Sequence, residues 1–164
     1  MGESEKERFA FPTSDRARRC IGLMNRNMVL AEWQRATQSL HAAELLAREG
    51  YREDAVSRAY YAILHAAKAV LFVHDVATTS HAAVRRMFGR YLIRTGGIER
   101  EWSSHLAEGL DDRLAADYDA SVSFSAEETQ QECQQARAFV ERMRRYLLIH
   151  DFTAHELATI VDNG

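Results

Sequence analysis

Arg113 and Tyr118 lie five residues apart and are of types that could act together on a phosphate group. A guanidinium can bind two phosphate oxygens at once, and a neighbouring phenol can add another hydrogen bond. An ordinary phenol has a pKa near 10, so Tyr118 is a poor general base at pH 7. The structural alternative is that Arg113 forms a capping ion pair with Asp117 or Asp112. The pattern therefore indicates anion binding, with Arg113, Asp117 and Tyr118 as candidates.

Three polar residues interrupt a long apolar stretch over residues 51–74. Arg58 and His65 are seven residues apart, hence nearly on the same side of a helix, and Lys68 follows three residues later. A polar group that becomes buried must find a partner or cost a few kcal/mol. One interpretation is a binding ridge. The other is that Arg58 pairs with a carboxylate such as Asp54, four residues earlier, and that His65 is hydrogen-bonded internally.

His81 is the last candidate, at the expected start of a helix. The N-terminus of a helix carries partial positive charge, so an anion could meet a neutral imidazole there. An ordinary surface histidine is the alternative. Arginines at positions 85, 86, 90 and 94 follow along the same helix, and a solvated helix face is their simplest interpretation.

These candidates must be positioned by helices, because apolar residues recur at steps of three and four along most of the chain. Gly50 is suited to end a helix in a left-handed conformation, and Ser125 with Glu128 forms a capping-box pattern. Nothing alternates with a period of two. The sequence predicts an all-α, five-helix, up-and-down bundle with helices near 29–49, 51–74, 81–95, 98–118 and 126–149.

The length of 164 residues suits one domain. Residues 1–27 are densely charged and predict a mobile N-terminal tail, in which Thr13, Ser14 or Asp15 could cap a short helix over residues 17–24. Residues 28–149 form the bundle, and residues 150–164 form a polar C-terminal tail. The net charge of −3 gives no overall case for nucleic acid. With two distant cysteines and no metal, nucleotide or acyl-transfer motif, no metal and no cofactor are expected. The absence of a long apolar run predicts a cytoplasmic protein that does not bind membranes.

Several segments together resemble a HEPN domain of the small prokaryotic uncharacterised, UPF0332-like subgroup. They are residues 39–46, the run Ser-Arg-Ala-Tyr-Tyr-Ala-Ile-Leu-His-Ala-Ala-Lys-Ala at 57–69, Ser-His at 80–81, residues 86–92 and residues 113–118. The resemblance covers about residues 30–148. It implies a helical bundle that forms a homodimer and is often encoded beside a small nucleotidyltransferase in a toxin–antitoxin pair.

In active members of that family, an arginine and a histidine with four to six residues between them meet their copies at the dimer interface. There they cleave RNA without metal. Arg113 aligns with that arginine, but Tyr118 stands where the histidine would be.

Two functions follow. The first is a dimeric binding and regulatory module that docks a nucleotidyltransferase or a nucleotide. The second is a metal-independent ribonuclease toxin that uses Arg113 and Tyr118, with His65 or His81. A purely structural helical protein is the remaining alternative.

Overall fold

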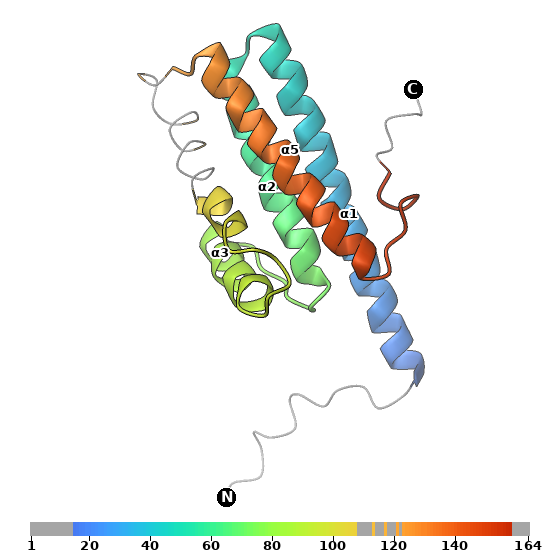
Figure 1. Ribbon diagram of the computed structural model, residues 1–164. Coiled ribbons are helices and arrows are strands. Elements are labelled where there is room, and N and C mark those ends of the chain that lie inside the picture. Colours follow the sequence, from blue (N-terminus) through green and yellow to red (C-terminus); the bar gives the residue numbers. More distant parts are fainter. Residues whose placement is uncertain (1–14, 108–112, 114–116, 118–120, 122, 159–164) are drawn as a thin grey trace, which may run out of the picture.

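The computed structural model describes residues 15–107, 113, 117, 121 and 123–158. Helix α1 (Asp15–Glu49) and helix α2 (Arg52–Phe72) form an antiparallel hairpin, and α5 (Ala126–Ile149) packs against both (Figure 1). Gly50 joins the first two helices with a φ of 86°, the left-handed conformation that a glycine adopts without strain. The described residues contain no strand, so the predicted all-α bundle is confirmed.

Helix α2 lies at the centre because its alanines let its neighbours approach closely. The alanines of its inner face are buried and leave room for larger side chains from the surrounding helices, including Phe88, Phe139 and Leu147. The long apolar stretch expected to form the core helix does so. No helix in the described part of the chain is long and apolar enough to cross a membrane.

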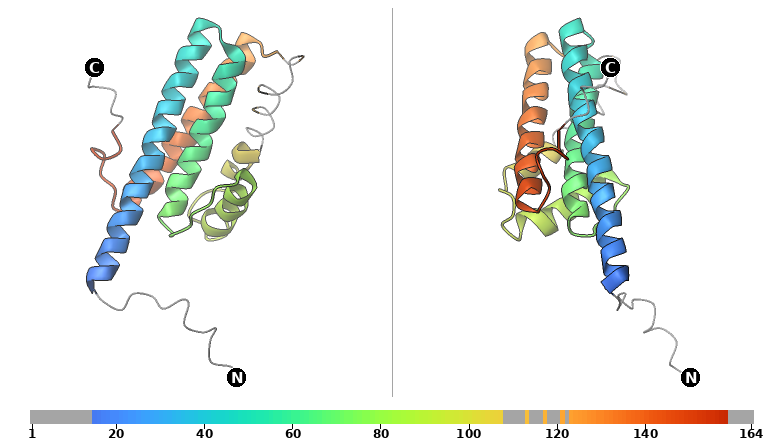
Figure 2. Two further views of the ribbon diagram at one scale, coloured as in Figure 1. Left: turned by 180° about the vertical axis from the view of Figure 1, so that it is seen from behind. Right: turned by 90° about the vertical axis from the view of Figure 1, so that its right-hand side faces the viewer.

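Helix α3 (His81–Phe88) covers one end of α2 and continues into a π-helical turn, η1 (Gly89–Ile93) (Figures 1 and 2). Ser80 caps α3 by accepting a hydrogen bond from the amide of Ala83. Residues 102–107 form a further helical segment, and Arg113 and Asp117 are helical as well. Residues 98–101 are described but not helical, so the predicted helix start at residue 98 is wrong and the helical segment begins at 102. The other residues predicted in this helix, 108–112, 114–116 and 118, lie outside the described residues. At the start of α5 the predicted capping box is present in full, between Ser125 and Glu128.

Helix α1 begins at Asp15, so the helix that the sequence allows over residues 17–24 is part of α1 and not a separate element in a tail up to residue 27. Charged residues hide the apolar period in this stretch, but arginine, leucine, methionine and alanine all favour helix, and they extend α1 by more than three turns. Part of this extension projects beyond the bundle (Figure 1).

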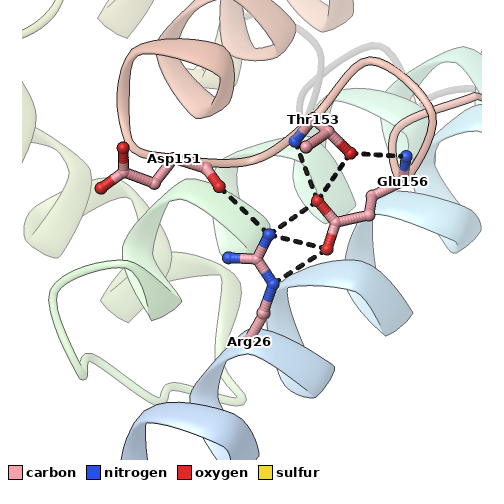
Figure 3. Close-up of polar contacts among 4 residues, drawn as sticks. All are labelled: Arg26, Asp151, Thr153 and Glu156. Carbon is pink, nitrogen blue, oxygen red and sulfur yellow. Dashed lines mark hydrogen bonds and ion pairs between the residues drawn. The ribbon is translucent and has the colours of Figure 1, made fainter.

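The segment after α5 differs from the expected C-terminal tail because residues 150–158 pack along α1. Phe152 and Leu157 are buried, and the indole Nε1 of Trp33 donates a hydrogen bond to the carbonyl of Leu157 at 3.0 Å. The guanidinium of Arg26 binds both carboxylate oxygens of Glu156, which also accepts from Thr153 (Figure 3). Phe152 and Leu157 are isolated apolar residues in a polar stretch, so they show no periodicity in the sequence. Their burial beside α1 is visible only in the structure.

Candidate anion-binding site

Glu32 of α1 lies against the polar side of α2. Its Oε2 atom is 2.6 Å from Nδ1 of His65, and its Oε1 atom is 3.5 Å from Nζ of Lys68. Only 7% of Glu32 is exposed, so this carboxylate depends on these two partners to offset its removal from water. Glu32 thus fixes His65 and Lys68 in position.

Charge and hydrogen bonding determine the ionisation of Glu32. Burial alone would raise the pKa of this carboxyl, but the hydrogen bond with His65 and the positive charge of Lys68 outweigh it, so the pKa lies below its ordinary value of 4.5. Glu32 is therefore ionised at neutral pH. It supplies the negative charge that balances Lys68.

Tyr60 and His81 form a second pair, between α2 and the first residue of α3. The Tyr60 hydroxyl lies 2.9 Å from Nδ1 of His81. Burial raises the pKa of Tyr60 to about 12, so the phenol stays protonated. Burial also lowers the pKa of His81, with further lowering by the charges of Arg113, Lys68 and His65. His81 is therefore neutral at pH 7.

Arg113 lies close to both pairs. Its Nη2 atom is 2.9 Å from Oδ2 of Asp117, and its guanidinium lies over the ring of Tyr61 at 5.1 Å from the centroid. The Tyr61 ring in turn stacks on His65. The side chain of Arg113 is only 14% exposed, and its Nε atom is buried without a hydrogen-bond partner among the residues that the structure describes.

These contacts join eight side chains from α1, α2, α3 and the 113–117 region, which we call the polar cluster: Glu32, Tyr60, Tyr61, His65, Lys68, His81, Arg113 and Asp117. The predicted candidates His65, Lys68, His81, Arg113 and Asp117 are all members. The ion pair of Arg113 with Asp117, expected as the structural alternative, is present. Tyr118 lies outside the described residues.

Arg58 does not belong to the polar cluster, and its predicted pairing with a carboxylate is wrong for the described part of the chain. It is exposed and forms no ion pair with Asp54 or Asp117. Arg58 shares a helical stripe with His65, but it stands two turns nearer to the start of α2. Its long side chain there reaches water past the edge of the buried face.

Three members of the polar cluster were missed from sequence: Glu32, Tyr60 and Tyr61. A signal for Glu32 existed, because it interrupts the apolar stripe of its own helix next to Trp33, just as His65 and Lys68 interrupt theirs. A carboxylate in the apolar stripe of one helix, with a histidine and a lysine in the apolar stripe of the next helix, favours a buried ion pair between the two helices. Tyr60 and Tyr61 gave no such signal, because an aromatic side chain within an apolar stripe equally fits simple packing.

The polar cluster suits an anion better than a metal ion. His65 and His81 use Nδ1 for their internal hydrogen bonds, and Nε2 of neither ring bonds a residue that the structure describes. Arg113 and Lys68 add two positive charges. Within the described ranges no group of three acidic, histidine or cysteine side chains is arranged to hold a metal. The arrangement can therefore donate hydrogen bonds and positive charge to a phosphate.

The sequence profile of the HEPN domain matches residues 30–150, which span α1 beyond its first turns, α2, α3 and α5. The chain belongs to the HEPN domain family. Every described member of the polar cluster falls inside the matched range, so the cluster is a feature of the HEPN bundle rather than of the terminal segments. The expected family membership is thereby confirmed.

Two relatives from the archaeon Methanocaldococcus jannaschii bear the name "Putative toxin". One is 30% identical over 115 residues, or 70% of this chain and 78% of the relative. The second is 36% identical over 112 residues, or 68% of this chain and 83% of the relative. A relative from Thermotoga maritima, named "UPF0332 protein", is 25% identical over 120 residues, or 73% of this chain and 91% of the relative.

Proposed function

We propose that this HEPN protein acts as a homodimeric binding and regulatory module in a toxin–antitoxin-like pair. Its partner is a small nucleotidyltransferase-type protein, and the polar cluster receives a phosphate of a nucleotide or of RNA. The names of the two archaeal relatives support the toxin-type role. The HEPN match supports the dimer and the partner, because both are implied by the family resemblance.

The observation that carries the phosphate proposal is the buried Nε of Arg113, which lacks a hydrogen-bond partner among the described residues. A buried donor without a partner costs about 1–3 kcal/mol, and an acceptor oxygen from a ligand would remove that cost. Arg113 has already been oriented by Asp117 and Tyr61, so little side-chain entropy is lost on binding. Lys68 contributes a second cation.

Isothermal titration of the purified protein with ATP tests this proposal. We expect measurable binding that weakens at least about tenfold in Arg113→Ala, which corresponds to the loss of one charged hydrogen bond. Arg145→Ala is the matched control, because Arg145 is exposed on α5 and pairs only with Glu141 among described residues. Equal affinities of wild type and Arg113→Ala would contradict a phosphate site at the polar cluster.

A growth assay tests the regulatory role. Inducible expression of the wild-type chain alone is expected to leave growth unchanged, and pull-down with the neighbouring gene product should recover a complex. Light scattering should give twice the chain mass, since the module is proposed to be a homodimer with Arg113 near the two-fold axis. Growth arrest by wild type that disappears in Arg113→Ala would instead favour a toxin.

The second candidate is a metal-independent ribonuclease, favoured by the lowered pKa of His81. A neutral imidazole can accept the proton of the RNA 2′-hydroxyl, whereas a protonated one cannot. In this reading Arg113 stabilises the phosphate, His81 or His65 transfers protons, and Tyr118 adds a hydrogen bond. RNA cleavage in EDTA by wild type, absent in Arg113→Ala, would establish it over the binding module.

A further inference from the structure

An arginine-lined surface lies beside the polar cluster, between α3 with η1 on one side and residues 100–107 on the other. Two hollows of about 620 and 790 Å³ adjoin there, and they share Ile93 and three arginines in their linings. We call this surface the arginine groove, defined by Arg85, Arg86, Arg90, Arg94 and Arg100.

The arginine groove is strongly cationic although the whole chain carries a net charge of −3. All five arginines are exposed, and within the described ranges none forms an ion pair and no acidic residue lines the two hollows. By contrast, Arg26, Arg137, Arg142 and Arg145 elsewhere in the bundle are each paired with a glutamate. A concave surface with one sign of charge attracts polyanions.

The spacing of the arginines matches a repeating anion. Arg86, Arg90 and Arg94 follow at four-residue steps, which advance about 6 Å along a helix. In an α-helix each such step overshoots one turn by about 40°, but η1 is a wider π-helical turn over Gly89–Ile93, which reverses this drift. The three guanidinium groups therefore stay on one side, and a polymer with a charge at every unit could be bound along them.

We propose that the arginine groove binds the sugar–phosphate backbone of a single-stranded polynucleotide. Among the described residues the groove offers no large apolar anchor of the kind that dominates protein interfaces, since their apolar members are Ala82, Ala107 and Ile93. The described residues that line the groove include no aromatic side chain on which a base could stack, so these contacts recognise phosphates rather than sequence.

The arginine groove is continuous with the polar cluster through α3. His81 begins this helix, and the charge of Arg85 acts on Tyr60, the hydrogen-bond partner of His81. A strand bound along α3 would thus pass one of its phosphates towards Arg113. Only this last step, the contact of a phosphate with Arg113, rests on the proposed function. The ligand class that we assign to the arginine groove is a polynucleotide.

The salt dependence of binding tests the groove. The probe is a fluorescent oligouridine RNA of about 12 nucleotides, a length within the usual range of single-strand sites. Each neutralised phosphate of a single strand contributes about −0.7 to the slope of log K against log salt, so five contacts predict a slope of about −3.5. Fluorescence anisotropy between about 50 and 200 mM salt measures it.

The test variant is Arg86→Gln, Arg90→Gln and Arg94→Gln together, and the control is Arg48→Gln, Arg137→Gln and Arg145→Gln. Both sets remove three positive charges, and glutamine keeps helix propensity. We expect the groove variant to lower the magnitude of the slope by about 2 and the affinity at least about tenfold, while the control keeps the wild-type slope. Circular dichroism verifies that both remain folded.

Three outcomes would overturn the groove proposal. They are equal losses in both variants, an unchanged slope in the groove variant, and no RNA binding by wild type at the lowest salt. Tighter binding of a duplex of the same length would reject the single-stranded ligand. This test can fail independently of the ATP titration of Arg113→Ala. A loss of ATP binding at Arg113 does not change the part of the salt slope that the groove arginines contribute to RNA binding.

Discussion

Nδ1 of His65 lies 2.6 Å from Oε2 of Glu32, so the two helices of the central hairpin are joined by a buried charged contact. The same carboxylate holds Lys68. Since Glu32 balances both partners, the positions of His65 and Lys68 depend on a residue of α1 that would not itself touch a bound phosphate.

We expect Glu32→Gln to destabilise the fold by about 1–3 kcal/mol at pH 7, because the variant leaves the partly buried Lys68 without its counter-charge. The folded-state pKa of Glu32 is below 4.5. Its contribution is therefore complete above pH 4.5 and is lost as the pH falls through the folded pKa. Urea unfolding of wild type and Glu32→Gln measures the difference in their free energies of unfolding. This difference should be smaller below pH 4.5 than at pH 7. A difference independent of pH would contradict the ionised contact, and Glu141→Gln on the surface is the control.

The pKa of His81 should rise in Arg113→Ala, because the charge of Arg113 is the strongest electrostatic cause of its lowering after burial. The titration midpoint, followed by NMR of the histidine ring, is expected below 6.5 in wild type and closer to 6.5 in the variant. Arg145→Ala should leave the midpoint as it is. If Arg113→Ala also leaves it unchanged, Arg113 does not lie near His81 in solution.

Leu157→Ala should destabilise the protein by about 2–3 kcal/mol, at the lower end for a buried leucine because the C-terminal segment can adjust. Leu157 is 2% exposed against α1. Ile149→Ala is the matched control, since that side chain is 77% exposed and should change the free energy of unfolding by less than about 0.5 kcal/mol. Equal effects of the two variants in denaturant unfolding would mean that residues 150–158 do not pack as described.

Tyr118→His is the substitution expected to create or raise RNA cleavage. A positioned imidazole contributes about 10²–10⁴-fold through proton transfer, which a phenol provides poorly at pH 7. We expect weak or no cleavage by wild type in EDTA, measurable cleavage by Tyr118→His, and none when Arg113→Ala is added. Robust cleavage by wild type would instead assign the proton transfer to His81 or His65.

The helices and their ends were predictable because they depend on local chemistry. The left-handed Gly50 and the capping box of Ser125 with Glu128 both lie where the sequence predicts them. The start of α1 at Asp15 was not specified, because charged residues hide the apolar period there. The packing of Phe152 and Leu157 was not predictable, because it depends on a surface contributed by a distant part of the chain.

The polar cluster was predictable in part. Polar residues inside an apolar stripe identified His65 and Lys68, the spacing from Tyr118 identified Arg113, and the expected helix start identified His81. The same argument wrongly placed Arg58 in the cluster. Periodicity alone does not show at which point along a helix the neighbouring helices stop covering it. Glu32 was missed because it belongs to a different helix, and only packing shows that it faces α2.

The contact of Arg26 with Glu156 joins residues 130 positions apart in the sequence. The hairpin of α1 and α2, by contrast, closes through the short connection at Gly50. Closing a longer loop costs more chain entropy, so the local hairpin can form early in folding and the C-terminal segment can dock only after α5 is in place. Residues 150–158 thus complete folding, and their amides should be among the first to exchange with solvent.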